Sequence, residues 1–324
     1  MNLKGNHSIY NVLIVGAGNI AAGYDRPGQL EYLTHTHAVC GSPYFNLSGF
    51  IDVCAKKANK AVSKWGGQSY CSLRDAFKNK IDIVAITVPD QFHYELLVEV
   101  TSFPVKLVFT EKPLAADVKG GLDIVSLYEK RNIPLCVNYK RRYAPEMSEL
   151  KKHIQQKLYG NFLTGSGCYG KGLVHNGSHL VDLLFFLLGE VTPISATYGF
   201  VDFTEEDPTA SASLLVKNRP FWMIGIDSNY CTVFELDLFF EKARIRVKDL
   251  GNCIEVSTME ESRVHKGYKV LGPPSQAHVS LDHSMKYSYE NIFHFLEGNE
   301  TLKCTGRDAL DSLEICLELK GKLK

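Results

Sequence analysis

The chain has 324 residues, of which 45% are hydrophobic and 22% are charged; this composition is typical of globular proteins, and the length is sufficient for two domains. Its 36 Lys and Arg residues balance its 36 Asp and Glu residues, so the formal net charge is zero. A neutral chain lacks the basic excess that drives binding to nucleic acid or to anionic membranes, so neither partner is expected.

Nine cysteines are scattered along the chain without a Cys-x-x-Cys pair. An odd number without motif spacing argues against a disulfide framework and against a zinc site. The chain begins with polar residues, and its longest apolar stretch is far shorter than a membrane span. We therefore expect a cytoplasmic protein with reduced, mostly buried thiols and no metal site.

The first 137 residues alternate strand-like and helix-like segments. Five short apolar runs predict strands, namely Asn11–Val15, Leu47–Asp52, Ile81–Val88, Val105–Thr110 and Pro134–Asn138. Runs that are apolar almost throughout are typical of parallel strands covered on both faces. Between the last two of these strands, Val118, Leu122 and Val125 recur at helical spacing. The alternation predicts an α/β domain over residues 1–137 with a doubly wound parallel sheet of the Rossmann type.

From residue 138 onwards the pattern changes. Predicted helices at Pro145–Leu158 and Leu180–Leu188 flank a predicted strand at Asn161–Tyr169. Six strands then follow without intervening helices, namely Ser195–Phe203, Ala210–Val216, Phe221–Asp227, Thr232–Phe240, Ala243–Lys248 and Cys253–Thr258. Strands in direct succession predict a large, mostly antiparallel open sheet with one polar or partner-covered face. Because the chain then returns to helix, we expect residues 138–324 to form an α+β domain.

A glycine-rich turn follows the first predicted strand. The segment Gly16-Ala17-Gly18-Asn19-Ile20-Ala21 fits the pattern G-x-G-x-x-A. The first glycine allows a tight turn, and the second lets the backbone approach a pyrophosphate at the start of the next helix. Asp52 ends the second strand, where a carboxylate can bind the adenosine ribose hydroxyls and repel a 2′-phosphate. The pattern therefore favours NAD as the cofactor, with NADP as the alternative.

The spacing between these two features is unusually long. Asp52 lies 34 positions after Gly18, whereas about 20 is usual. The additional length is the polar segment Tyr24–His37, which we expect to form a loop that interrupts the first helix. It carries His35 and His37, for which a surface position and a position lining a cleft both stay open.

The fourth predicted strand ends at Glu111-Lys112-Pro113. Open α/β sheets place their ligands at the carboxyl ends of parallel strands. A lysine at that edge can face a nicotinamide ring and exchange a proton with a substrate hydroxyl. As an isolated tripeptide, however, the sequence is better explained by an ordinary surface loop.

Several motifs occur in the order found in the Gfo/Idh/MocA family of sugar and cyclitol oxidoreductases, which essentially the whole chain resembles. They are GAGNIA at 16–21, TVPDQFH at 87–93, EKP at 111–113, NYKRRY at 138–143 and HNGSHLVD at 175–182. The resemblance implies an NAD(P)-binding Rossmann domain and a second α+β domain. It also implies that the open sheet of the second domain forms a homodimer or homotetramer.

The resemblance further implies roles for individual residues. Cofactor contacts are expected from Gly16, Gly18, Asn19, Ile20, Asp52, Thr87, Pro89, His93, Glu111 and Asn138. Substrate contacts are expected from Lys112, Arg142, Tyr143, Asn176 and His179, with Lys112 and His179 as catalytic residues. Two alternatives stay open: His93 can be a helix-start residue that is bonded locally, and the Lys140–Arg142 run can be a solvated face.

HNGSHLVD departs from the usual family pattern D-x-G-x-H-x-x-D, because His175 stands where the dehydrogenases commonly have Asp. An imidazole can bind hydroxyls when neutral and a carboxylate when protonated, so His175 is kept as a catalytic candidate beside His179 and Asp182. The change suggests an altered substrate class or reaction. The two histidines also have the spacing of a metal pair, but no third ligand of matching spacing accompanies them.

Together these features predict an NAD-dependent oxidoreductase that transfers a hydride between the nicotinamide and a secondary hydroxyl or keto carbon of a sugar derivative. A nucleotide-activated or amino sugar of surface-polysaccharide synthesis is one candidate substrate. Two other functions stay open. One is a glycosidase or lyase that oxidises its substrate transiently without net NADH formation, and the other is a non-catalytic dinucleotide-binding regulator.

Overall fold

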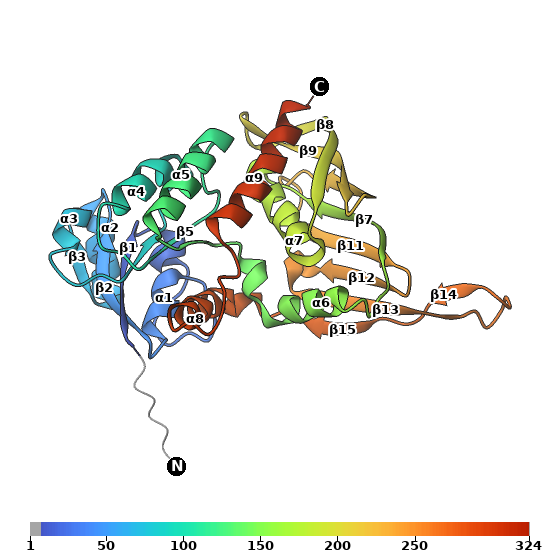
Figure 1. The fold of residues 1–324 in the computed structure, drawn as a ribbon, viewed down its shortest axis with the longest axis horizontal. Coiled ribbons are helices and arrows are strands. Elements are labelled where there is room, and N and C mark those ends of the chain that lie inside the picture. The colour runs from blue at the N-terminus through green and yellow to red at the C-terminus, as the bar shows by residue number, and fades with distance from the viewer. Residues whose placement is uncertain (1–7, 324) are drawn as a thin grey trace, which may run out of the picture. The chain divides into compact units, whose positions relative to one another are not determined.

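The computed structural model describes residues 8–323 and divides the chain into two compact units (Figure 1). The first unit comprises the chain up to Tyr143 together with Asp282–Leu310, and the second comprises Ala144–Leu281 and the chain from Asp311 onwards. The two sheets confirm the predicted fold class. The boundary differs from the predicted one after residue 137, because a late segment returns to the first unit.

The first unit is built on a six-stranded parallel sheet with the strand order β3-β2-β1-β4-β5-β6. Its strands are β1 (Tyr10–Val15), β2 (Phe45–Ile51), β3 (Gln68–Tyr70), β4 (Ile83–Ile86), β5 (Leu107–Thr110) and β6 (Leu135–Val137). Every residue of β4, β5 and β6 is buried, as parallel strands covered on both faces require. Five of these strands lie where the sequence predicts them, whereas the short strand β3 carries no apolar run and is missed.

Helices cover this sheet. They are α1 (His35–Cys40), α2 (Ala55–Trp65), α3 (Leu73–Ala76), α4 (His93–Val100), α5 (Val118–Arg131) and α8 (Ser284–Leu296), with short turns η1 (Asn19–Gly23), η2 (Asp90–Phe92) and η3 (Lys140–Tyr143). Helix α8 packs against α1, although the two are far apart in the sequence (Figure 1). In α5 the buried stripe includes Ile124, Val125 and Tyr128, and Leu122 is exposed, so the predicted helix is correct but its buried face is rotated.

The first helix of the nucleotide-binding motif is broken, as the length of the polar segment predicts. The turn η1 is a single turn of π-helix, and α1 starts only eleven residues after η1 ends. Carbonyl groups at the end of a helix need hydrogen-bond donors. Thr36 Oγ1 donates to the Ala21 carbonyl (2.7 Å), and Lys64 Nζ donates to the Ala22 carbonyl (2.9 Å). Side chains therefore replace the missing helical turns.

The second unit carries the large sheet, whose strand order is β14-β13-β12-β11-β7-β10-β9-β8, with β15 paired to β13. Its strands are β7 (Phe162–Tyr169), β8 (Val191–Thr204), β9 (Asp207–Val216), β10 (Arg219–Gly225), β11 (Phe234–Phe240), β12 (Ala243–Lys248), β13 (Cys253–Glu261), β14 (Lys269–Leu271) and β15 (Ser275–His278). All pairs are antiparallel except β7 with β10. The prediction of a mostly antiparallel sheet is confirmed, and the late strands β14 and β15 are missed.

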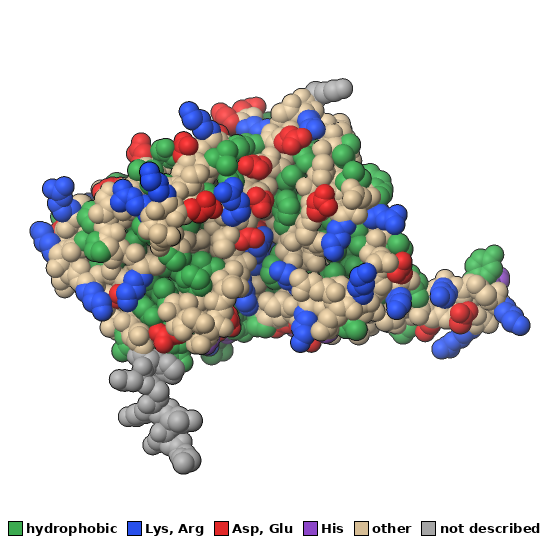
Figure 2. Space-filling view, in the orientation of Figure 1, with side chains coloured by type: hydrophobic (Ala, Val, Ile, Leu, Met, Phe, Trp, Pro, Cys, Tyr) green, Lys and Arg blue, Asp and Glu red, His purple; other side chains and the backbone are tan. Residues whose placement is uncertain are grey.

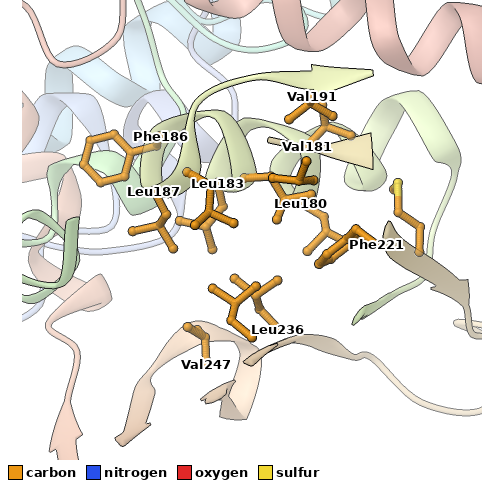
Figure 3. Packing of buried hydrophobic residues seen from close by; sticks show 14 of the residues in the cluster. Leu180, Val181, Leu183, Phe186, Leu187, Val191, Phe221, Leu236 and Val247 are labelled. Carbon is orange, nitrogen blue, oxygen red and sulfur yellow. The ribbon is translucent and has the colours of Figure 1, made fainter. Parts of the chain in front are cut away.

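Helices pack on one face of this sheet and form the core of the unit. They are α6 (Pro145–Gln155), α7 (Ser178–Leu188) and α9 (Gly306–Gly321), with short turns η4 (Leu173–Gly177), η5 (Asp249–Gly251) and η6 (Leu281–His283). Figure 3 shows Leu180 and Leu183 of α7 above Leu236 of the sheet. A Cβ added to Gly167 of β7 would lie 2.7 Å from the Leu180 side chain, so the missing side chain of this glycine lets α7 approach the strand.

The opposite face of the large sheet is polar with apolar patches. Arg244 Nε donates to Asp237 (2.9 Å), and Lys248 Nζ donates to Glu255 (2.7 Å). On β10 of the same face, Trp222 is 48% exposed. Beyond β12, the ends of β13 and β14 pair as a narrow ribbon that projects from the sheet, with basic and hydrophobic side chains near its tip (Figures 1 and 2).

The nine cysteines are free thiols. Cys40, Cys54, Cys71 and Cys231 are exposed, so the prediction that most thiols are buried is wrong. These residues lie on helix ends and loops, where local sequence gives no measure of exposure. Within residues 8–323, no helix combines the length and the apolar character needed to cross a membrane.

Candidate cofactor and catalytic site

The glycine-rich turn lies directly after β1 and against the end of β4. Gly16 has a φ of +97°, and a Cβ at this position would lie 2.8 Å from the Thr87 carbonyl oxygen, so only glycine fits. Thr87 Oγ1 in turn donates to the Val15 carbonyl (3.0 Å). A Cβ added to Gly18, in contrast, meets no atom within 4 Å. The absence of a side chain at Gly18 therefore leaves open space beside the backbone.

Asp52, at the end of β2, is held against this turn. One carboxylate oxygen accepts a hydrogen bond from Ala17 N (2.8 Å), and the other accepts one from Cys54 N (2.8 Å). The structure thus brings the predicted residues Gly16, Gly18 and Asp52 together.

A cavity of about 380 Å³ lies beside the same turn. It is lined by Ala17, Gly18, Asn19, Ala22 and Gly23 and, from α2, by Lys57, Lys60, Ala61 and Lys64. Asn19 is exposed and Ile20 is half-buried. Sequence reasoning missed the lysines of α2, which recur at helical spacing and give the cavity a basic wall suited to phosphate groups.

His93 is bonded inside the first unit, and its predicted cofactor contact stays a prediction. It is 1% exposed, and its Nδ1 and Nε2 atoms lie 2.7 Å and 3.0 Å from the carbonyl oxygens of Pro113 and Val88. Both ring nitrogens are therefore used to join the turn after β4 to the turn after β5, which corresponds to the locally bonded alternative. Pro89 is exposed beside it.

A cluster of polar side chains surrounds Glu111 at the carboxyl end of β5. Glu111 Oε1 accepts hydrogen bonds from Asn138 Nδ2 (2.7 Å) and lies 2.9 Å from His35 Nε2. Burial by itself raises the pKa of Glu111, but the hydrogen bond from His35, the contact with Asn138 and the charge of Lys112 bring it below its ordinary value. Glu111 is therefore a fixed negative charge beside the predicted catalytic lysine.

His35 and His37 are buried in α1, so neither lies on the surface. His37 Nδ1 lies 3.0 Å from Asp25 Oδ2, and the backbone N–H groups of Leu33 (2.8 Å) and Thr34 (3.1 Å) donate to the same oxygen. Asp25 thereby links residues of the inserted loop to one another. The sequence shows an interrupted helix but contains no local signal for these contacts.

Lys140 adds a second amine near Glu111. Its side chain is exposed at the surface, yet burial of its ammonium group, followed by the positive charge of Arg141, lowers the pKa of Lys140 to about 8. Lys112 lowers this pKa further, and Glu111 raises it. Sequence reasoning left Lys140 as part of a solvated run, although its position two residues after Asn138 places it near the edge of the sheet.

Arg142 and Tyr143 are buried within the first unit. Arg142 is 4% exposed and donates to the Lys303 carbonyl (3.1 Å) and to Asp308 Oδ1 (2.9 Å). Tyr143 is fully buried, and its hydroxyl donates to the Val137 carbonyl (3.0 Å). Both side chains anchor η3 in the interior of the first unit, and their substrate contacts stay predictions.

The histidine motif of the second unit lies on η4 and α7. Asp207 accepts hydrogen bonds from the backbone N–H groups of Val174 and His175, both at 2.8 Å, and so caps η4. The ring of His175 stacks on Phe203 with a centroid distance of 4.2 Å. Asn176 Nδ2 donates to the Gly170 carbonyl (2.9 Å).

His179 and Asp182 follow on α7. His179 is half-buried and Asp182 is buried. The predicted catalytic roles of His179 and His175 stay predictions. Within the part of the chain that the structure describes, no group of three or more His, Cys, Asp and Glu side chains is placed to hold a metal ion.

The first unit fits a dinucleotide at three points. Gly18 leaves room for close backbone approach, and Asp52 presents a carboxylate beside it. Asn138 is 5% exposed, and its Oδ1 atom has no hydrogen-bond partner among residues 8–323. An amide group of a ligand can satisfy this buried acceptor, since buried polar atoms are nearly always bonded.

Comparison with known proteins agrees with this geometry. Residues 10–139 match a family model described as "Oxidoreductase family, NAD-binding Rossmann fold". The match covers the Rossmann part of the first unit and agrees with the resemblance to the Gfo/Idh/MocA family that the motifs carry. Inositol 2-dehydrogenase from Corynebacterium glutamicum (strain R) is 30% identical over 159 residues, a match that covers 48% of this chain and 44% of that protein. The chain thus spans less than half the length of the curated relative it matches.

Solved structures of other dehydrogenases share the fold over nearly the whole chain. The WlbA dehydrogenase from Bordetella pertussis, in complex with NADH and UDP-GlcNAcA, superposes with a TM-score of 0.78 at 18% identity and covers 98% of this chain and 96% of that chain. UDP-N-acetylglucosamine 3-dehydrogenase GnnA from Acidithiobacillus ferrooxidans has a TM-score of 0.72 at 14% identity, with coverages of 97% and 98%. At these identities the likeness shows the fold alone.

Proposed function

We propose that the chain is an NAD-dependent oxidoreductase that acts on a CH–OH group of a sugar or sugar derivative. The observation that carries the proposal is the cluster at the end of β5, where ionised Glu111 lies beside Lys112 in the same unit as the glycine turn. NAD, when bound, supplies hydride acceptance and donation. The chain itself then has to orient the two reactants and move the hydroxyl proton.

Different residues bind the cofactor and exchange the proton. Gly16, Gly18 and Asp52 hold the adenosine side of the dinucleotide, and Asn138 Oδ1 accepts from an amide group. Lys112 exchanges the proton of the substrate hydroxyl, while Glu111 keeps an opposite charge beside it. His179, with His175 and Asp182, is proposed to complete the proton exchange on the basis of the family resemblance.

The substrate class is proposed from the relatives. The similar proteins include an inositol 2-dehydrogenase, a UDP-N-acetylglucosamine 3-dehydrogenase and a dehydrogenase in complex with UDP-GlcNAcA. A nucleotide-activated sugar suits the family resemblance of the motifs as well. We therefore propose a cyclic polyol or a nucleotide-linked sugar as substrate, in a cytoplasmic enzyme.

The test is a panel of inositols, free sugars and UDP-linked sugars with NAD or NADP, followed by the absorbance of the reduced cofactor. We expect net NADH formation with at least one substrate, and its loss in Lys112→Ala but not in the control Lys119→Ala, an exposed lysine of α5. If product forms without net NADH formation, the protein is instead a glycosidase or lyase that oxidises its substrate transiently. If the Lys112→Ala protein still binds the cofactor and keeps its biological role, the result supports a non-catalytic regulator.

The open face of the large sheet is the proposed oligomer interface. Trp222 and Ile224 of β10 are 48% and 39% exposed on this face, next to ion pairs that a second copy can complement. We expect sedimentation of the unaltered chain to show a dimer or tetramer, and Trp222→Glu to shift it toward the monomer. A monomer at all concentrations contradicts this interface.

A further inference from the structure

A buried histidine from α1 contacts the carboxylate at the end of β5. His35 Nε2 lies 2.9 Å from Glu111 Oε1, and His35 Nδ1 lies 3.1 Å from the hydroxyl oxygen of Tyr289 on α8. The His35 side chain is fully buried, and its ring packs on Phe109 with a centroid distance of 4.9 Å. We propose that His35 is a positioning residue that keeps Glu111 ionised and oriented beside Lys112. This inference rests on the proposed oxidoreductase function.

The ionised carboxylate of Glu111 defines the direction of one hydrogen bond of His35. A carboxylate only accepts hydrogen bonds, so the proton in the 2.9 Å contact lies on His35 Nε2 and points to Glu111. Burial, followed by the negative charge of Glu111, raises the pKa of the Tyr289 hydroxyl well above its ordinary value, so this group stays neutral 3.1 Å from Nδ1. Tyr289, His35 and Glu111 therefore form a chain of hydrogen bonds that ends on the carboxylate.

Glu111 depends on this chain for its charge. Burial raises its pKa, and the hydrogen bond from His35 is the largest contribution in the opposite direction. The contacts with Asn138 and Lys112 add to it. Loss of the imidazole therefore shifts Glu111 toward its protonated form, and a neutral Glu111 no longer balances the charge of Lys112.

The other groups that face this cluster do not replace His35. Lys140 of η3 attracts Glu111 by its positive charge, whereas the hydrogen bonds to Glu111 come from His35 and Asn138. The thiol of Cys136 on β6, which faces Tyr289, stays neutral because burial raises its pKa to about 12. Cys40 at the end of α1 is exposed as a residue, but desolvation of its thiol raises the pKa to about 11, so it is neutral as well. Tyr289 itself is neutral.

Helix α1 offers a matched control. His37 lies two residues after His35 and is also buried, but it bonds to Asp25 and stacks on Tyr32, with a centroid distance of 4.4 Å. These contacts belong to the inserted loop and not to the end of β5. A change at His37 therefore tests the effect of disturbing α1 alone.

The experiment compares His35→Ala, His35→Gln, His37→Ala and Glu111→Gln in the full chain. In His35→Ala we expect kcat to fall about tenfold and the acid limb of the kcat–pH profile to move up by about one pH unit, with the NAD dissociation constant within about threefold. His35→Gln, whose amide N–H can replace the Nε2 donor, should restore most of the shift. His37→Ala should leave the acid limb in place, and adding His35→Ala to Glu111→Gln should not move it further.

Thermal unfolding tests the same contact without turnover, so the failure of the proposed function can be told apart from the failure of this inference. Because the pKa of folded Glu111 lies below its ordinary 4.5, ionised Glu111 stabilises the fold above that value, and the contribution is lost as the pH falls through the lowered pKa. His35→Ala should therefore lower Tm more at about pH 7 than at about pH 4, but not in the Glu111→Gln background. An unmoved acid limb together with a pH-independent loss of Tm overturns the proposal.

Discussion

Replacing each glycine of the nucleotide-binding turn by alanine separates two roles that the structure gives to Gly16 and Gly18. At Gly16, a φ of +97° is costly for alanine, and the new Cβ lies 2.8 Å from the Thr87 carbonyl oxygen. The left-handed conformation costs about 1–2 kcal/mol and the steric overlap about 1–3 kcal/mol, so Gly16→Ala should lower the free energy of unfolding by about 2–4 kcal/mol. At Gly18, φ is −79° and no atom lies within 4 Å of the Cβ, so the change should stay within about 0.5 kcal/mol.

For cofactor binding the order is reversed, because Gly18→Ala should have the larger effect. The Cβ of Gly18→Ala fills the open space that lets the backbone approach the pyrophosphate. A lost hydrogen bond to a charged group costs about 1.5–3 kcal/mol, which is a weakening of NAD binding by about 10- to 140-fold. Gly18→Ala should therefore fold normally and bind NAD poorly.

Urea unfolding and calorimetric titration with NAD measure the two effects on the same samples. Gly28→Ala is a control for backbone strain, because Gly28 also has a positive φ, +80°, but no atom lies within 4 Å of an added Cβ. It should cost less stability than Gly16→Ala and leave NAD affinity unchanged. Undiminished NAD affinity in Gly18→Ala, or a Gly16→Ala protein that unfolds at the same urea concentration as the unaltered chain, refutes the reasoning.

Three further changes test the contacts that support the site. Leu180→Ala removes a buried side chain between α7 and β7 and should cost about 3–5 kcal/mol in urea unfolding without changing the dissociation constant of NAD. Asp25→Ala leaves buried donors of the inserted loop, including Thr34, unbonded and should cost about 2–4 kcal/mol; a cost near zero contradicts its role. The positive charge of Arg142 and the hydrogen bonds from Thr305 hold the pKa of Asp308 below its usual range despite burial. Arg142→Met removes that charge. The loss of Tm in this variant should therefore be largest at neutral pH and shrink below about pH 4.

Most of the sheet framework could be predicted from sequence because it depends on local composition. Parallel strands buried on both faces read as continuous apolar runs, and β4 and β5 have this pattern. Strand β3 lies at the sheet edge with two of three residues exposed, so nothing in its composition separates it from a loop. The return of 282–310 to the first unit was not predictable either, because helix periodicity does not state which core a helix joins.

The candidate site likewise contains features that could be predicted from the sequence and features that could not. The juxtaposition of Gly16, Gly18 and Asp52 could be predicted because it depends only on a strand, a turn and the next strand end. Arg142 could not, because its run of basic residues looks solvated and its partner Asp308 is 166 positions away. A charged side chain is buried where a distant carboxylate is available to pair with it, and that information is absent from the local sequence.

The buried histidines show most clearly where local reasoning ends. His35 follows a polar loop, a setting typical of exposed residues, yet its two hydrogen-bond partners lie 76 and 254 positions away, on β5 and α8. A buried imidazole is stable where both of its ring nitrogens find hydrogen-bond partners. Here Tyr289 and Glu111 are these partners. The same contacts that allow His35 to be buried therefore direct its Nε2 proton to Glu111. Removing the ring cannot separate its structural role from its proposed effect on Glu111, whereas a glutamine, whose amide N–H can still donate to Glu111, can separate them.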